Sequence, residues 1–175
     1  MVFYEYTYHL DQDLSKVFEY FLQKAYLVRF FKDSSEEVVL NSDEENPYLE
    51  VGEKMELVIG DKESISSFEI DTLEIQEEVL IDLSIRFTDI VDKSNSSLED
   101  DAETFDFMKR HLGIDIFFRL EFYDDFDRTR VRETAELQNH RLAWYAKAFW
   151  KLMGWYYLFK QRSIHQAVKD EIEFG

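Results

Sequence analysis

The chain has 175 residues, of which 38 are acidic and 20 are basic, giving a net charge of −18, and 45% of its residues are hydrophobic. A nucleic-acid partner is excluded, because this negative field repels polyanions and phosphate binding needs clustered Lys and Arg. The aromatic content of 17% argues against intrinsic disorder, and the lack of cysteine excludes disulfides and thiolate zinc sites.

Neither a targeting segment nor a membrane span is visible in the sequence. The N-terminal residues lack the basic stretch and apolar run of a signal peptide. The densest apolar segment, 143–159, is interrupted by Lys147 and Lys151, whereas a transmembrane helix needs roughly 18 uncharged apolar residues. We therefore expect a soluble, cytoplasmic protein without membrane insertion.

The first 32 residues predict one strand followed by two helices. Residues 2–10 alternate between apolar and polar side chains, which is the period of a half-buried strand. The apolar side of this strand is formed by Tyr4, Tyr6, Tyr8 and Leu10. Asp11 or Asp13 then caps an amphipathic helix, and residues 26–31 indicate a second, short helical segment packed under the first.

The middle of the chain predicts an antiparallel meander. Residues 33–48 indicate an edge strand and a loop, and alternating apolar residues predict strands at 55–59, 68–75 and 79–87. In the second of these strands the apolar residues change face, which predicts a β-bulge near Asp71 that would curve the sheet.

Residues 88–112 break this alternation. Ser97 and Asp100 fit a capping box for one short helix, and apolar residues recur after it. We predict that this insert lies over one end of the sheet as a partly helical flap. Two further strands, at 114–122 and 129–137, follow the insert before the pattern becomes helical for the rest of the chain.

This order of elements predicts a single α+β domain spanning residues 1–175. Strands in a meander pair antiparallel, and a sheet with one apolar face must be covered by helices. We therefore predict a curved antiparallel β-sheet wrapped around a long C-terminal helix, with a short N-terminal helix pair as the second cover.

The C-terminal helix carries two apolar stripes, so it needs cover on two sides. We predict that the first stripe faces the sheet. Its large members are Tyr145, Phe149, Leu152, Met153 and Tyr156. The second stripe contains Trp144, Ala148, Trp155 and Phe159. The flap, a membrane surface or a second copy of the chain could cover it. The acidic body disfavours an anionic membrane, so a homodimer through Trp144 and Trp155 stays open beside the flap.

Short motifs accompany this architecture. Val17-Phe18 on the first helix, the glycine turn at 51–54 and the Thr-Arg-Val opening of the last strand, within 127–131, resemble the START-like or Bet v 1-like helix-grip superfamily (SRPBCC), which includes relatives of the Hsp90-ATPase activator Aha1. The resemblance spans nearly the whole chain, and the insert at 88–112 and the long aromatic final helix depart from it. It implies a ligand pocket rather than an activity, because the superfamily has no universal catalytic set.

No catalytic or metal-binding motif is recognisable. The histidines, which lack metal-ligand spacing, are His9, His111, His140 and His165. The acidic clusters at 42–45 and 99–103 lack the alternating ligands and the glycine of a calcium loop. We therefore predict no metal site, no cofactor and no catalytic residue.

Glu133 is unusual because it lies on the predicted inner face of its strand. A buried carboxylate is costly unless it is paired or protonated. One interpretation is an ion pair with an Arg of a neighbouring strand, or a position near the rim of the sheet. The other is a polar anchor in an apolar pocket, or an acid/base group.

Three functions are compatible with these patterns. The first is non-catalytic binding of a hydrophobic small molecule, lipid-like or polyketide-like, in an apolar cavity between sheet and helix. The candidate ligand-binding residues are Tyr6, Tyr8, Phe118, Glu133, Tyr145, Phe149, Met153 and Tyr156. The second is a protein-interaction module, like a chaperone cofactor, that uses the acidic surface and the aromatic helix face. The third is a cyclase- or dehydratase-type enzyme with Glu133 as acid or base.

Overall fold

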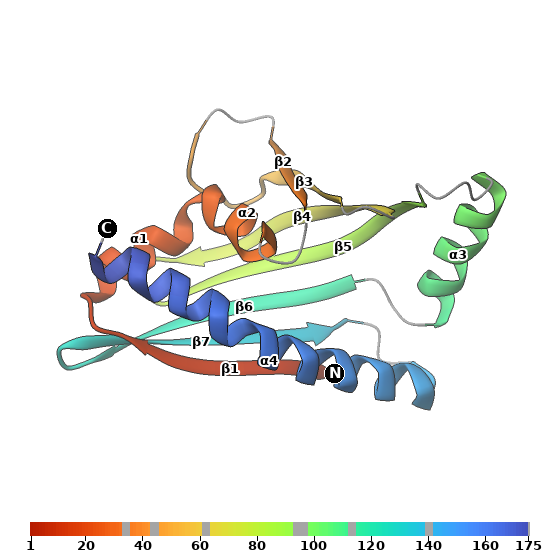
Figure 1. The fold of residues 1–175 in the computed structure, drawn as a ribbon. Coiled ribbons are helices and arrows are strands. Elements are labelled where there is room, and N and C mark those ends of the chain that lie inside the picture. Colours follow the sequence, from red (N-terminus) through yellow and green to blue (C-terminus); the bar gives the residue numbers. More distant parts are fainter. Residues whose placement is uncertain are drawn as a thin grey trace.

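The computed structural model consists mainly of an antiparallel sheet packed against a long C-terminal helix (Figure 1). It describes residues 1–32, 36–42, 46–60, 64–92, 98–111, 115–138 and 142–174. Within these residues, seven strands form one sheet in the order β1-β7-β6-β5-β4-β3-β2. The strands are β1 (Val2–Leu10), β2 (Glu37–Ser42), β3 (Lys54–Gly60), β4 (Ser64–Gln76), β5 (Leu80–Asp92), β6 (Asp115–Asp125) and β7 (Arg128–Leu137). The helices are α1 (Leu14–Leu22), α2 (Lys24–Lys32), α3 (Leu98–His111) and α4 (Trp144–Phe174). The predicted α+β helix-grip architecture is confirmed.

The sheet has an apolar inner face because its strands alternate in the predicted way. On β7, for example, Val131 and Leu137 are fully buried, whereas Arg130 is exposed. Helices α1, α2 and α4 lie on the inner side of the sheet (Figure 1). The core between these layers is rich in large aliphatic and aromatic side chains, including the fully buried Leu10 and Phe21.

Strand β1 is the one strand whose partner is distant in sequence. Strands β2 to β7 pair in chain order, and β1 closes the sheet against β7. Tyr4 stands opposite Ala135 and Tyr8 opposite Val131, so the inner residues of the two strands share one face. The register shifts between Val2 and Tyr4.

The predicted bulge near Asp71 is confirmed. The pairing of β4 with β5 shifts register between Thr72 and Glu74, and a second shift, which the sequence did not predict, lies between Ser67 and Phe68. A bulge inserts one extra residue in one strand and increases the local twist. Two shifts in these paired strands are consistent with the curvature of the sheet.

The predicted N-terminal helix pair is confirmed as α1 and α2. Asp13 is the N-cap of α1 in extended conformation, but its side chain makes no capping hydrogen bond. The chain straightens at Gln23, which forms an isolated bridge with Tyr48. Backbone hydrogen bonds from Lys24 to the Pro47 carbonyl and from Leu49 to Leu22 therefore fix the helix pair to the segment before β3.

The insert predicted as a flap is helix α3, which stands at one end of the sheet (Figure 1). Phe105 packs against Phe87 of β5, with ring centroids 5.5 Å apart. The insert begins later than predicted, because β5 continues past Thr88 to Asp92. Ser97 of the predicted capping box lies outside the described residues.

Helix α4 crosses β1 at Gly154, the residue of the helix that has no side chain. A Cβ atom on Gly154 would overlap the carbonyl oxygen of Phe3 and lie 2.8 Å from its carbon. Before this contact in the chain, Leu142 and Ala146 are buried in a small cluster with Leu137, and after it Val168 and Ile172 enter the core. Small residues in the first half of α4 thus allow the close approach of helix and strand.

The prediction that the large apolar stripe of α4 faces the sheet is wrong for four of its five residues. Tyr145 and Phe149 are each 40% exposed, Tyr156 is 48% exposed and Leu152 is 63% exposed. The face of α4 that lies on the sheet is set by how closely the helix can approach β1, not by the size of its apolar side chains. Gly154 and Ala146 face β1, and the bulky residues are therefore rotated away from that contact.

No described helix has the length and apolarity required to cross a membrane.

Candidate functional site

The most unusual feature of the interior is a fully buried carboxylate, Glu133, with 0% exposure. Strand alternation places it between Val131 and Ala135 on the inner face of β7, as the sequence predicted. Its cross-strand neighbours are Tyr6 on β1 and Leu120 on β6. A carboxylate in this position needs partners, because desolvation of an unpaired charge is very unfavourable.

Three tyrosines from two elements supply hydrogen bonds to Glu133. The hydroxyl of Tyr4 donates to Oε2 at 2.8 Å, and that of Tyr8 donates to Oε1 at 2.9 Å. Tyr26 of α2 donates to Oε1 at 3.4 Å. Burial, followed by the negative charge of Glu133, raises the pKa of all three tyrosines, so they remain neutral donors.

Helix α4 contributes His165 to the same centre. Its Nε2 lies 3.2 Å from Oε1 of Glu133, within ion-pair distance but without the geometry of a hydrogen bond. The imidazole packs against Tyr6 and Tyr8, with centroid separations of 4.5 Å and 4.2 Å. Side chains of β1, β7, α2 and α4 therefore meet at one polar centre inside the apolar core, which we call the Glu133 centre (Tyr4, Tyr8, Tyr26, Glu133 and His165).

The partners of Glu133 differ from those expected. The sequence suggested an Arg on a neighbouring strand or a position near the rim, and neither is found. Tyr4 and Tyr8 lie on the inner face of β1, which pairs with β7. Their contact with Glu133 could therefore have been predicted from the alternation of β1. The role of His165 could not, because it depends on how α4 is rotated on the sheet.

The eight predicted ligand-binding residues fall into two groups. Tyr6, Tyr8 and Glu133 come together at the Glu133 centre, and the buried Phe118 packs nearby in the core, against Phe30 of α2 at 6.1 Å. The other four lie on the first half of α4. They are Tyr145, Phe149, Met153 and Tyr156, of which Met153 is half-buried and the other three are exposed.

The first half of α4 also touches α3. The Tyr145 hydroxyl and Nδ1 of His111 are 2.9 Å apart, and the His111 ring stacks on Phe107. The flap therefore reaches Tyr145 of the first stripe, whereas it was predicted as one possible cover of the second stripe. It leaves Trp144 80% exposed and Trp155 68% exposed.

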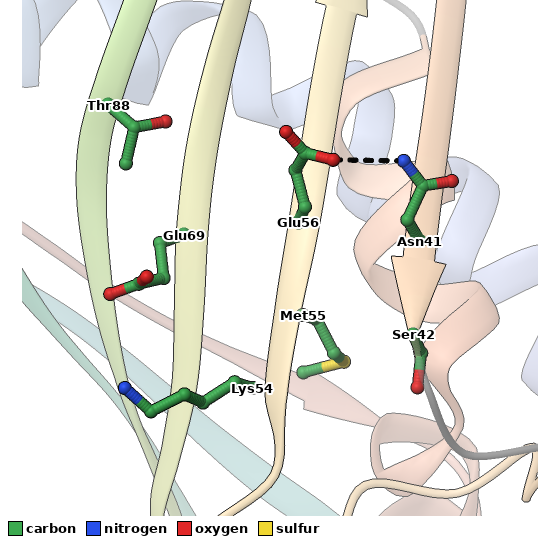
Figure 2. Close-up of a pocket in the computed structure, with 7 residues that line it drawn as sticks. All are labelled: Asn41, Ser42, Lys54, Met55, Glu56, Glu69 and Thr88. Carbon is green, nitrogen blue, oxygen red and sulfur yellow. Dashed lines mark hydrogen bonds between the residues drawn. The ribbon is translucent and has the colours of Figure 1, made fainter.

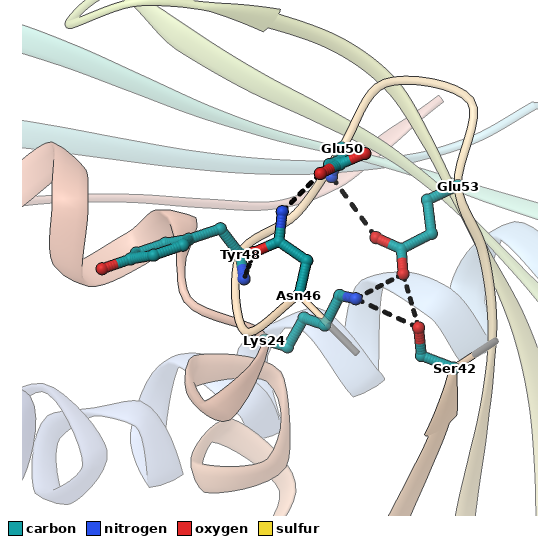
Figure 3. Close-up of polar contacts among 6 residues, drawn as sticks. All are labelled: Lys24, Ser42, Asn46, Tyr48, Glu50 and Glu53. Atoms are coloured by element: carbon teal, nitrogen blue, oxygen red, sulfur yellow. Dashed lines mark hydrogen bonds and ion pairs between the residues drawn. The ribbon is translucent and has the colours of Figure 1, made fainter. Parts of the chain in front are cut away.

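A second buried polar group joins α2 to the strands (Figure 3). Nζ of Lys24 lies 2.5 Å from Oε1 of Glu53 and 3.0 Å from the Ser42 hydroxyl. Burial opposes ionisation of Glu53, but hydrogen bonds from Lys24 and Ser42 hold its pKa below the ordinary value. With both ions paired, the arrangement fixes α2 against β2 and the loop before β3.

A depression of about 460 Å³ lies on the sheet surface turned away from the helices (Figure 2). It is lined by Asn41, Ser42, Lys54, Met55, Glu56, Glu69 and Thr88. Asn41 donates to Glu56 at 3.1 Å, so part of its polar lining is already satisfied. This open, largely polar surface differs from the apolar cavity between sheet and helix that the sequence suggested. Among the described residues, no group of His, Asp or Glu side chains could hold a metal ion.

Comparison with known proteins identifies the fold class. The sequence matches no protein-family model and no curated protein. A protein from Arthrobacter aurescens solved by NMR is 11% identical, with a TM-score of 0.61, and the match covers 98% of this chain and 86% of that one. Ara h 8.0201 is 10% identical, with a TM-score of 0.58, and the match covers 98% and 97% of the two chains. The Aha1 dimer from Colwellia psychrerythraea is 10% identical, with a TM-score of 0.51 and coverage of 100% and 98%.

These likenesses extend over nearly the full length of the chain and include Bet v 1-like proteins. The chain therefore has the helix-grip fold of the Bet v 1-like and START-like proteins, which confirms the fold predicted from the sequence.

Proposed function

We propose that the chain, acting as a single domain, is a non-catalytic binding protein for a hydrophobic small molecule, lipid-like or polyketide-like. The observation that carries the proposal is the contrast between the two halves of α4. The second half enters the core through His165, Val168 and Ile172. The first half contacts the sheet through small residues and leaves Tyr145, Phe149 and Tyr156 40–48% exposed.

The ligand contact is assigned to the wall formed by Tyr145, Phe149, Met153 and Tyr156, which we call the α4 wall. Aromatic side chains give a large apolar area, and tyrosine hydroxyls can orient a ligand that carries a few polar atoms. The contact of Tyr145 with His111 places α3 beside this wall. The group at Tyr6, Tyr8, Phe118 and Glu133 is assigned to the core instead, because its side chains pack on one another, on α2 and on His165 in the second half of α4.

We do not assign catalysis to Glu133. Both of its carboxylate oxygens already accept hydrogen bonds from tyrosines, and the side chain is fully buried. A general acid or base must reach the proton that it transfers, directly or through one water.

Phe149→Ala tests the wall. We expect the variant to bind Nile red about tenfold more weakly than the wild type, because it removes roughly half of the 1.5–3 kcal/mol that a fully buried phenyl ring contributes. The neutral dye avoids repulsion by the acidic chain. Since the ring is half-exposed, unfolding stability should fall by only about 1 kcal/mol, rather than the 3–5 kcal/mol of a fully packed core phenylalanine. Titration followed by dye fluorescence, with urea melts, measures both.

Phe126→Ala is the matched control, because Phe126 is 99% exposed in the turn between β6 and β7, away from α4. Equal dye affinity of the two variants would contradict the assignment. Native mass spectrometry of protein purified from its own cells then identifies the natural ligand by its mass.

A second candidate function is self-association through Trp144 and Trp155, favoured by their exposures of 80% and 68%. With about 150–250 Å² per aromatic side chain, Trp144 and Trp155 leave on the order of 300 Å² uncovered. This area is the size of an ordinary monomer patch, so an interface of roughly 800 Å² per partner would also need residues beside the two tryptophans. The similarity to an Aha1 that forms a dimer supports the same candidate.

Sedimentation separates the two candidates. If α4 mediates a two-fold contact, the wild type sediments as a dimer and Trp155→Glu as a monomer, because each copy would place a carboxylate in the apolar interface. A wild type that stays monomeric at high concentration contradicts self-association. Trp155 lies ten positions after Tyr145, on a different side of α4 from the wall, so Phe149→Ala should leave the oligomeric state unchanged.

A further inference from the structure

The hairpin that joins β6 to β7 carries the most exposed large apolar side chain among the described residues. It projects from the end of the sheet opposite α3 (Figure 1). Phe126 at its tip is 99% exposed, and the next in order, Trp144, is 80% exposed. Single exposed apolar residues are ordinary on protein surfaces, so the exposure alone indicates no function.

The backbone of Phe126 is strained as well. Its φ is 65°, whereas Asp127 after it has no positive φ. Strand pairing continues up to Asp125 and Arg128, so Phe126 and Asp127 alone form the turn. A two-residue hairpin turn with positive φ at its first central residue is of type II′, and glycine is normal there. A bulky side chain at positive φ is a genuine outlier. Neither its conformation nor its exposure gives this ring a role in folding.

The base of the hairpin is rigidly held. The hydroxyl of Thr129, a fully buried residue, donates to the Gln12 carbonyl at 2.8 Å. Between the two strands, the guanidinium carbon of Arg130 lies 4.5 Å from the centroid of the Tyr123 ring. The tip is therefore presented in a fixed position, and such preorganisation reduces the entropy lost on binding.

The Phe126 ring stands among negative charges. Its neighbours in the chain are Asp124, Asp125 and Asp127, and the single cation in the stretch 124–128 is Arg128, 3.9 Å from Asp127. The side chain of Asp127 is 90% exposed. We call this apolar tip with its carboxylates, residues 124–128, the Phe126 hairpin.

The shape and charge of the Phe126 hairpin select its partner. Small-molecule sites are concave, so a protruding tip cannot enclose a ligand and the partner must supply the cavity. Nucleic acids and anionic membranes are repelled by the carboxylates. A protein surface with an apolar pocket and a basic rim complements both the ring and the charges around it.

We infer that the Phe126 hairpin is a docking site for a partner protein, which receives the Phe126 ring in an apolar pocket rimmed by Lys and Arg. Strained residues persist where function retains them, and large aromatic anchors dominate the energy of interfaces. The inference does not depend on ligand binding at the α4 wall, because the first half of α4 lies toward the other end of the molecule (Figure 1). Phe126→Gly should therefore leave Nile red binding unchanged.

Photo-crosslinking from position 126 is the first test. The full chain carries p-benzoylphenylalanine in place of Phe126 and is irradiated in an extract of its own cells. We expect one adduct with a second protein, identified by its mass. The matched control carries the same group in place of Phe107, which is 55% exposed on α3 at the other end of the molecule, and should not form that adduct. The lack of an adduct from position 126, or the same adduct from position 107, would overturn the inference.

The affinity of the purified partner for the unmodified chain then tests the two recognition features separately. Phe126→Gly should bind about thirtyfold more weakly, as expected for an aromatic anchor. Asp127→Asn should bind up to about fivefold more weakly and with a smaller dependence on salt, because a rim charge is removed. If Phe126→Gly binds as tightly as the wild type, the captured protein is not docked on the ring and the inference is wrong.

Two controls exclude other roles for the ring. Glycine adopts positive φ without steric cost, so Phe126→Gly should unfold at the same urea concentration as the wild type or a higher one. A lower midpoint would make the ring part of the fold. Sedimentation with phosphatidylcholine vesicles, with and without phosphatidylserine, should show no binding. Vesicle binding that is lost in Phe126→Gly would make the hairpin a membrane contact and contradict the inference.

Discussion

Gly154→Ala is expected to destabilise the protein by about 3 kcal/mol, which is the upper part of the range for overpacking. A Cβ atom at this position would overlap the carbonyl oxygen of Phe3, which belongs to the backbone and cannot rotate away like a side chain. Helix α4 would have to move off β1, and the packing of the buried Ala146, about two turns before Gly154, would loosen with it.

The sign of this change in stability tests the close contact of Gly154 with Phe3. In an exposed helix, alanine is favoured over glycine by about 1 kcal/mol, so a glycine without close contact would give a stabilised variant. Urea unfolding followed by tryptophan fluorescence is well suited, because Trp144, Trp150 and Trp155 are the protein's three tryptophans and all lie in α4. Ala148→Gly, at an exposed position of α4, measures propensity alone and should lose about 1 kcal/mol. A Gly154→Ala variant more stable than the wild type would disprove the close contact.

The second large effect is expected for Glu133→Ala, which should lose about 3–5 kcal/mol, as when one partner of a buried ion pair is removed. The change leaves the hydroxyls of Tyr4, Tyr8 and Tyr26 without their acceptor and removes the carboxylate beside Nε2 of His165. Four elements meet at this point, so their packing should loosen together. Equilibrium unfolding in urea measures the loss.

Two further variants help to interpret the loss of stability in Glu133→Ala. Glu133→Gln keeps the shape and one acceptor oxygen, so it should be less damaging, at about 1–3 kcal/mol. Glu136→Ala, on the same strand but on its half-exposed side, should stay within about 0.5 kcal/mol of the wild type. If Glu133→Ala unfolds at the wild-type urea concentration, the carboxylate is dispensable for the fold.

Much of the sheet could be predicted from alternation alone, because the inner residues of each strand are selected by burial. The bulge in β4 is visible in the sequence for the same reason, since Leu73 falls out of phase with Ile70. The boundary of β5 could not be predicted, because the alternation of apolar and polar residues stops at Phe87, whereas pairing with β4 continues the strand from Thr88 to Asp92.

The rotation of α4 was the main error, and its cause is general. Hydrophobic periodicity locates apolar stripes, but two stripes on one helix leave the choice of inner face open. Here the choice is made by the one place where helix and strand backbones come closest, at Gly154 and Phe3. The same rotation brings His165 to Glu133, so the sequence could not indicate this contact.

The pairing of β1 with β7 also sets the order in which the protein can fold. Strand β1 is synthesised before its neighbour and can pair only after Arg128 and the residues beyond it have been added. Closing a loop of this length costs about 4 kcal/mol in chain entropy, and such non-local pairings slow folding. Tyr4 and Tyr8 reach Glu133 in the same step. Closure of the sheet and hydrogen bonding of its buried carboxylate should therefore be a single late event. Until then, the edge of β7 in the meander from β2 to β7 stays open.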